Sequence, residues 1–113
     1  MATYNIPDQR RGDTWDGINS ICIQVNGVPA NLTGALIKAE FRRSIDAPVA
    51  LTLSTTNGGI VITNPTGGII QFPPKLIEIP FGKYLYDLQV TYPNGVVKTY
   101  FSGTWTITPD LTE

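Results

Sequence analysis

The most regular alternation in the chain lies in residues 84–108, which read YLYDLQVTYPNGVVKTYFSGTWTIT. Apolar and aromatic side chains occupy the even positions from 84 to 92 and most odd positions from 97 to 107. Between them stands Tyr92-Pro93-Asn94-Gly95, where Pro suits the second place of a type I turn and Gly suits a positive φ. A period of two is typical of half-buried strands. These residues therefore predict a long antiparallel β-hairpin.

Shorter stretches of the same kind cover the rest of the chain and predict an all-β fold. The expected strands span residues 18–25, 35–43, 51–53, 60–62 and 69–72, and Asn26-Gly27 predicts a type I′ turn. Pro73, Pro74 and Pro80 bracket a connection, for which we expect one helical turn whose Leu and Ile cover an open end of the core.

Seven or eight strands at this spacing predict one domain over residues 1–113, a two-sheet antiparallel sandwich, with a small barrel as the alternative. The expected core comprises Trp15, Ile21, Ile23, Ile37, Phe41, Leu88, Val90, Trp105 and Ile107.

Composition favours a structural or binding module over an enzyme. Hydrophobic residues make up 42% of the chain and charged residues 15%, which argues against a disordered chain. Eight basic and nine acidic residues give a net charge of −1, so no basic field favours nucleic acid as a partner. The chain has no His and one Cys, which removes the commonest catalytic base and metal ligand. We expect no catalytic residue, no cofactor and no metal.

The apolar runs of the sequence predict neither a signal peptide nor a membrane-spanning segment. The first residues, Met-Ala-Thr-Tyr-Asn-Ile-Pro, have no charged region followed by an apolar one. No apolar run approaches the ~20 residues that cross a bilayer. We therefore expect a protein made in the cytosol, where a single thiol stays reduced.

Two short motifs have structural explanations that we prefer to their functional ones. Arg11-Gly12-Asp13 matches the integrin-binding tripeptide, but Gly12 suits a turn before a strand, with the Asp13 side chain bonded to nearby backbone N–H groups. Asn31-Leu32-Thr33 is a glycosylation sequon, and we expect it to shape the turn into the next strand.

The candidate reactive and contact residues are few. Cys22 alternates with isoleucines inside a strand, which predicts a buried or half-buried inert thiol. Asp8, Asp13 and Asp16 form the one carboxylate cluster, but their spacing lacks a full calcium-ligand set. Tyr100 lies opposite the packed face of its strand and is the better candidate for a contact residue.

An ordered set of motifs resembles a known family. It comprises Arg11-Gly12-Asp13-Thr14-Trp15, Asn31-Leu32-Thr33-Gly34-Ala35 leading into residues 37–42, residues 80–90, and the segment from Ser102 to Asp110. In this order they resemble the small immunoglobulin-like modules of tailed bacteriophages, and are similar to the N-terminal domain of phage baseplate upper proteins.

The resemblance implies an immunoglobulin-like sandwich and a non-enzymatic structural protein of a virion, in a tail, baseplate, neck or fibre attachment. Its partners would be other virion proteins and symmetric copies of itself, with no nucleic acid and no membrane. The alternatives are a capsid decoration protein, a module that binds host glycans, and an enzyme that uses a carboxylate or Cys22. For the virion role we expect most partner contacts at residues 2–7, at the tail 109–113, and at the loops 57–59 and 64–68. The polar strand face with Lys38, Glu40 and Arg42 is the second choice.

Overall fold

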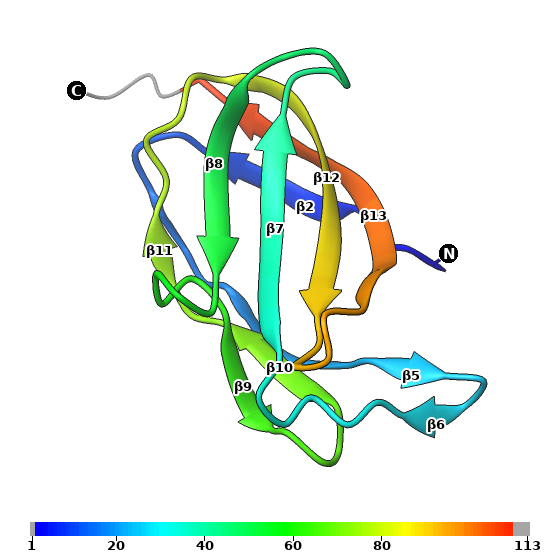
Figure 1. Ribbon diagram of the computed structural model, residues 1–113. Coiled ribbons are helices and arrows are strands. Elements are labelled where there is room, and N and C mark those ends of the chain that lie inside the picture. The colour runs from blue at the N-terminus through cyan, green and yellow to red at the C-terminus, as the bar shows by residue number, and fades with distance from the viewer. Residues whose placement is uncertain (1, 110–113) are drawn as a thin grey trace.

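The computed structural model describes residues 2–109, and it contains strands, turns and loops (Figure 1). Eight strands have four or more residues, in agreement with the predicted seven or eight, and the others have two. They are β1 (Ala2–Thr3), β2 (Ile6–Arg10), β3 (Thr14–Trp15), β4 (Ile18–Cys22), β5 (Gln24–Val25), β6 (Val28–Pro29), β7 (Leu36–Arg42), β8 (Val49–Ser54), β9 (Val61–Asn64), β10 (Ile69–Phe72), β11 (Lys75–Leu76), β12 (Gly82–Thr91) and β13 (Val97–Thr108).

The fold is an all-β, immunoglobulin-like sandwich, as predicted. One sheet has the order β1-β13-β12-β7-β8, with β2 also on β13, and the other has the order β4-β10-β9. Two-stranded pairs join β11 to β3 and β5 to β6. The β5–β6 pair projects from the body as a hairpin (Figure 1).

The predicted hairpin of residues 84–108 is confirmed as β12 and β13. Gly95 has a φ of 88°, and its N–H donates to the Tyr92 carbonyl at 2.9 Å. The even residues of β12 are buried from Tyr84 to Val90, which matches the predicted face. Asn26 and Gly27 both have positive φ, so the predicted type I′ turn is confirmed as well.

Aromatic rings join the two sheets in the core. Trp15 lies between Phe72 of the smaller sheet, at 6.0 Å, and Trp105 of the larger sheet, at 4.7 Å between ring centroids. Phe41 continues the cluster from Trp105 to Tyr86. Eight of the nine predicted core residues are buried, and Ile21 is half-buried.

Two local predictions are wrong, and a third holds in part. The strand expected over 18–25 breaks at Ile23, whose N–H turns to the Gly68 carbonyl. Residues 73–80 form no helical turn, because β11 pairs with β3 and Ile77 exchanges backbone bonds with the Gly12–Asp13 turn. Of that connection, Ile77 is buried whereas Leu76 is half exposed.

The N-terminal segment 2–7 is an integral part of the larger sheet and not a free extension, and its expected partner contacts stay a prediction. β1 and β2 pair with β13 in parallel, and Ile6 is buried. Trp105 Nε1 donates to the Pro7 carbonyl at 3.1 Å. Of the expected C-terminal contact segment, residues 110–113 lie outside the described residues.

Candidate functional site

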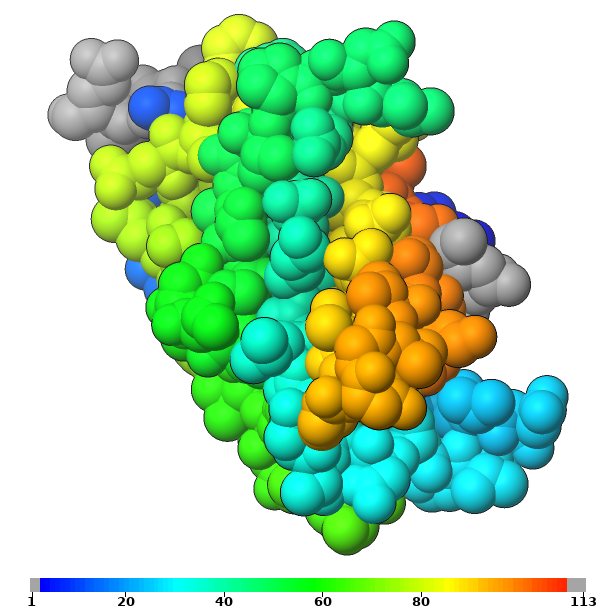
Figure 2. Space-filling view, in the orientation of Figure 1, coloured from blue at the N-terminus to red at the C-terminus, as the bar shows by residue number. Residues whose placement is uncertain are grey.

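The outward face of the larger sheet carries an ordered set of polar side chains. Alternation turns Lys38, Glu40 and Arg42 of β7 outward, and it turns Leu85, Asp87 and Gln89 of β12 outward. Strand register aligns them in three rows: Lys38 opposite Gln89, Glu40 opposite Asp87, and Arg42 opposite Leu85. β13 extends two of these rows with Ser102 and Thr104. In the space-filling view, β8, β7 and β12 lie side by side on one face (Figure 2).

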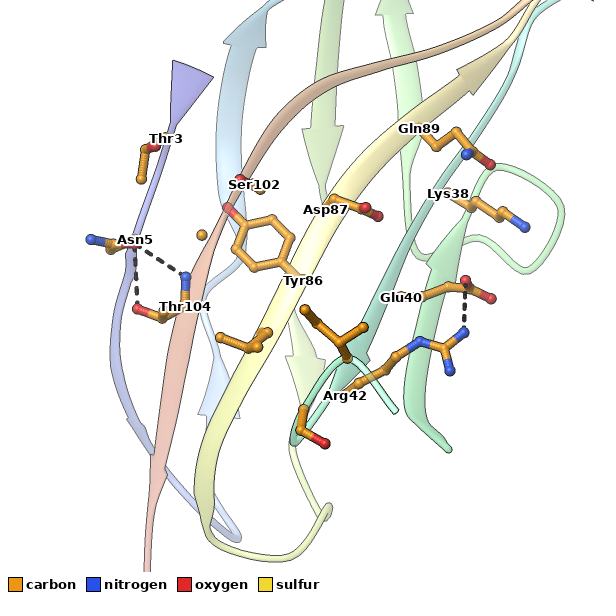
Figure 3. A pocket seen from close by; sticks show the side chains of 14 residues that line it. Thr3, Asn5, Lys38, Glu40, Arg42, Tyr86, Asp87, Gln89, Ser102 and Thr104 are labelled. Carbon is orange, nitrogen blue, oxygen red and sulfur yellow. Dashed lines mark hydrogen bonds and ion pairs between the residues drawn. The ribbon is translucent and has the colours of Figure 1, made fainter. Parts of the chain in front are cut away.

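This face is hollowed into a groove of about 620 Å³. Its floor is formed by outward residues of β7, β12 and β13. Thr3 and Asn5 of the N-terminal segment line one side, and Ser44 and Ile45 of the β7–β8 loop line another. In Figure 3, Lys38, Glu40 and Arg42 lie along β7, with Asp87 and Gln89 on the neighbouring strand.

The N-terminal wall is held in place by several contacts. Asn5 Oδ1 accepts hydrogen bonds from the Thr104 N–H at 3.1 Å and from the Thr104 hydroxyl at 3.3 Å. The Tyr86 hydroxyl donates to the Tyr4 carbonyl at 2.6 Å. Gly103 stands beneath this carbonyl, and a Cβ there would overlap it. The wall is thus fastened to the floor before any ligand arrives.

The loop wall is fastened by Arg42. Its Nη1 donates to the Ala47 carbonyl at 2.9 Å, and its Nη2 lies 3.5 Å from Glu40 Oε1. One guanidinium therefore holds the loop and pairs with a carboxylate of the floor. Ile45, in the same loop, is 85% exposed at the rim of the groove.

Three polar groups of the floor are left without partners. Within residues 2–109, the Lys38 ammonium, the Asp87 carboxylate and the Gln89 amide make no hydrogen bond or ion pair. Glu40 and Asp87 are directly opposite on neighbouring strands, where two like charges repel each other. The floor can therefore receive a cation at Asp87 and an anion at Lys38.

A second, smaller hollow lies beside the outer edge of β8. It has a volume of about 330 Å³, and its walls include Thr52, Asn57 and Lys75. Asn57 is occupied within the fold, because its amide bonds the backbone of Ser54, Gly59 and Thr52. This hollow therefore offers fewer free polar groups than the sheet groove.

The carboxylates singled out in the sequence do not form a metal site. Asp8, Asp13 and Asp16 are all exposed. Among residues 2–109, no group of three or more His, Cys, Asp or Glu side chains could hold a metal ion. No helix in that same range has the length and hydropathy to span a bilayer.

The two short motifs lie in turns, as their structural explanations predicted. Gly12 has a φ of 89°, and its N–H donates to the Ile77 carbonyl at 2.8 Å. Asp13 forms hydrogen bonds through its backbone N–H and C=O groups, whereas bonds from its side chain were expected. In the sequon, Asn31 Oδ1 accepts bonds from both the N–H and the hydroxyl of Thr33.

Two predictions about single side chains are wrong. Cys22 is exposed, because its face of β4 points away from the core, and its thiol contacts the Gly67 carbonyl at 3.5 Å. Tyr100 is half-buried and packed against the core, so it is not an outward contact residue. The cause is a β-bulge: Leu88 pairs with Phe101 and Gln89 with Thr99, which leaves Tyr100 without a partner on β12.

Two tyrosine hydroxyls have altered acidity, and one of them, that of Tyr86, belongs to a residue that lines the groove. Burial, together with the hydrogen bond to the Tyr100 hydroxyl, raises the pKa of Tyr92 to about 12. Burial also raises the pKa of Tyr86, with a smaller contribution from Tyr4. Both phenols therefore act as neutral hydrogen-bonding groups of the fold.

Sequence reasoning found most of the floor but not the groove. The alternation predicted Lys38, Glu40 and Arg42 on one polar face and Asp87 with Gln89 on another. That these two faces adjoin depends on the pairing of β7 with β12, which no local signal predicts. Nothing in the sequence around Asn5 or Ile45 predicts that these residues line the groove.

Comparisons with known proteins add little beyond the fold. No protein-family model matches the chain, and no curated protein is similar to it. Among solved structures, CopC from Methylosinus trichosporium OB3b matches with a TM-score of 0.49 and 9% identity, over 94% of this chain and 88% of that chain. A match of this kind concerns the fold alone, so no binding property of CopC is carried over.

The predicted function is corrected by this comparison. A structural protein of a bacteriophage virion was expected, but a solved structure that the chain matches is CopC and not a virion protein. The expected virion role is therefore withdrawn. The resemblance to phage modules was drawn from motifs, and no family model tests it.

Proposed function

We propose that this chain is a non-enzymatic binding module that holds a segment of a partner protein in the groove of its larger sheet. The proposal rests on the polar side chains of the groove floor that have no hydrogen-bond or ion-pair partner. Lys38, Asp87 and Gln89 have no partner within residues 2–109, although the walls beside them are tied to the sheet. Fixed walls around free polar groups provide a preorganised site.

Charge supports a protein partner over a nucleic acid or a membrane. The floor carries two cations, Lys38 and Arg42, and two anions, Glu40 and Asp87. The whole chain has a net charge of −1. A polyphosphate or an anionic lipid surface selects a basic field, which this face does not provide. Protein segments carry both signs of charge and also apolar side chains, which suit Leu85 and Ile45.

The paired carboxylates do not favour an enzyme. A general acid needs a carboxyl group in a desolvated setting. Asp87 is exposed, and Glu40 is paired with the Arg42 guanidinium at 3.5 Å. No His exists anywhere in the 113 residues to serve as a proton carrier. Asp87 and Glu40 are instead suited to attract a charged group of a partner.

A library of short random peptides displayed on a carrier and selected on the immobilised protein tests this function. We expect peptides to be enriched that bind the wild-type protein and are lost on Lys38→Ala and Asp87→Ala. Lys98→Ala and Asp16→Ala are matched controls, because both residues are exposed and lie outside the groove lining. Selected peptides that bind the groove variants as tightly as the wild type would show that the site lies elsewhere.

A further inference from the structure

Lys38, Asp87 and Leu85 of the groove floor lie along a bent line with similar spacing. Lys38 and Asp87 are diagonal neighbours, since Asp87 is opposite Glu40 and Glu40 stands two residues after Lys38. Diagonal neighbours on paired strands are ~7–8 Å apart. Asp87 and Leu85 stand two residues apart on one strand, which is ~6.8 Å at 3.4 Å per residue. The order along this line is cation, anion, apolar side chain.

The side chains on one side of an extended polypeptide have a similar spacing. Its alternate side chains point to one side and recur every ~6.8 Å. Three alternate side chains of such a segment can therefore meet Lys38, Asp87 and Leu85 in turn. The partner with matching charge has an acidic residue at Lys38, a basic residue at Asp87 and an apolar residue at Leu85, where Ile45 also lines the groove.

The middle position is the most strongly selective. Asp87 faces Glu40 directly across the strands, so a cation placed there meets two carboxylates. Arg42 pairs with Glu40 at 3.5 Å and also donates to the Ala47 carbonyl, which leaves Asp87 without a countercharge of its own. Binding a basic side chain would relieve the repulsion that two opposite like charges create.

We propose that the groove recognises an extended peptide with an acidic and a basic residue two positions apart and an apolar residue two positions beyond the basic one. This rests on the proposed function, and it names the chemistry of the segment that the groove takes. The proposal specifies the order of the three side chains and not the chain direction of the peptide.

Two synthetic peptides with blocked ends provide the test. The probe is Glu-Thr-Lys-Thr-Leu, and the swapped peptide of equal composition is Lys-Thr-Glu-Thr-Leu. Each is titrated into the 15N-labelled protein, and backbone amide shifts are followed by NMR. We expect the probe to shift amides at residues 38, 85 and 87 and to bind about tenfold more tightly than the swapped peptide, which is the size expected for two exposed ion pairs.

The charge-reversed protein Lys38→Glu/Asp87→Lys gives the decisive comparison. It should prefer the swapped peptide by a similar factor, and the neutral variant Lys38→Gln/Asp87→Asn should show no preference. If both peptides shift the groove amides equally in the wild type, the order of subsites is wrong while the groove remains a peptide site. If neither peptide shifts these amides at millimolar concentration, both this inference and the proposed function are overturned.

Discussion

The two faces of β12 use their polar atoms in opposite ways. On the inner face, the Tyr84 hydroxyl donates to the Pro80 carbonyl and the Tyr86 hydroxyl donates to the Tyr4 carbonyl. Throughout the described part of the chain, no buried side-chain nitrogen or oxygen lacks a hydrogen bond. On the outer face, Asp87 and Gln89 have none.

The difference separates the groups that build the fold from those that can serve a partner. A buried polar atom without a hydrogen bond costs ~1–3 kcal/mol, so the inner face cannot leave one unpaired. An exposed polar atom is hydrated and costs the fold little. Inner-face substitutions should therefore change stability strongly, and outer-face substitutions should change binding with little effect on stability.

Truncation of Trp105 should have the largest effect on the inner face. Its side chain is fully buried and contacts the rings of Trp15 and Phe41. Trp105→Ala should lower the free energy of unfolding by about 3–5 kcal/mol, as large aromatic truncations in cores do. Chemical denaturation measures this. Trp105→Phe, which keeps a ring, should lose less, and an unchanged denaturation midpoint for Trp105→Ala would contradict the core assignment.

Addition of one methyl group at Gly103 should have the next largest effect. A Cβ there would overlap the Tyr4 carbonyl, which is backbone and is held by the Tyr86 hydroxyl. Gly103→Ala should lower the free energy of unfolding by about 1–3 kcal/mol. It should also raise amide hydrogen exchange at residues 4–6, because the N-terminal strand must move. Ser102→Ala, one residue away, is the matched control, and equal stability of the two variants would contradict the close approach.

Ionisation of the Tyr92 hydroxyl should weaken the fold at high pH. Its folded-state pKa, raised to about 12, exceeds the ordinary tyrosine value of 10.0, so the folded state favours the neutral phenol. The stabilising contribution is therefore complete below pH 10 and is lost as the pH rises toward about 12. Tyr92→Phe should flatten this part of the stability profile, as measured by denaturation at a series of pH values. An unchanged stability profile for Tyr92→Phe would contradict this assignment.

How far the sequence predicts this structure depends on how local each feature is. The β12–β13 hairpin was predictable because its two strands alternate strongly and a four-residue turn sets their register as far as the bulge at Tyr100. β2 was missed because residues 6–10, with Pro7, do not alternate, and its place depends on β13 nearly a hundred residues later. The inward position of Tyr100 was missed because a bulge leaves no mark in the alternation.

The site was predictable only in part, for the same reason. Each polar face could be identified from one strand, but the opposition of Glu40 and Asp87 arises when two distant strands pair. The loop wall depends on the Arg42 bond to the Ala47 carbonyl, which is a tertiary contact. The groove is therefore a product of register and not of any single motif.

The smallest change in stability should come from the outer face, at Asp87. Asp87→Asn removes a negative charge that stands opposite Glu40 and makes no ion pair of its own within residues 2–109. Opposite like charges on paired strands repel, so the free energy of unfolding should stay equal or rise by about 0.2–0.5 kcal/mol.

The salt dependence of this change identifies its cause. Screening weakens the interaction between exposed charges, so the gain from Asp87→Asn should be largest at low ionic strength and should vanish in concentrated salt. Glu40→Gln is the informative partner variant, because it relieves the same repulsion but also removes the pair with Arg42. It should therefore gain less than Asp87→Asn. A loss of about 1 kcal/mol or more on Asp87→Asn would mean that the carboxylate stabilises the fold. The outer face would then serve the structure as the inner face does, and the contrast between them would not hold.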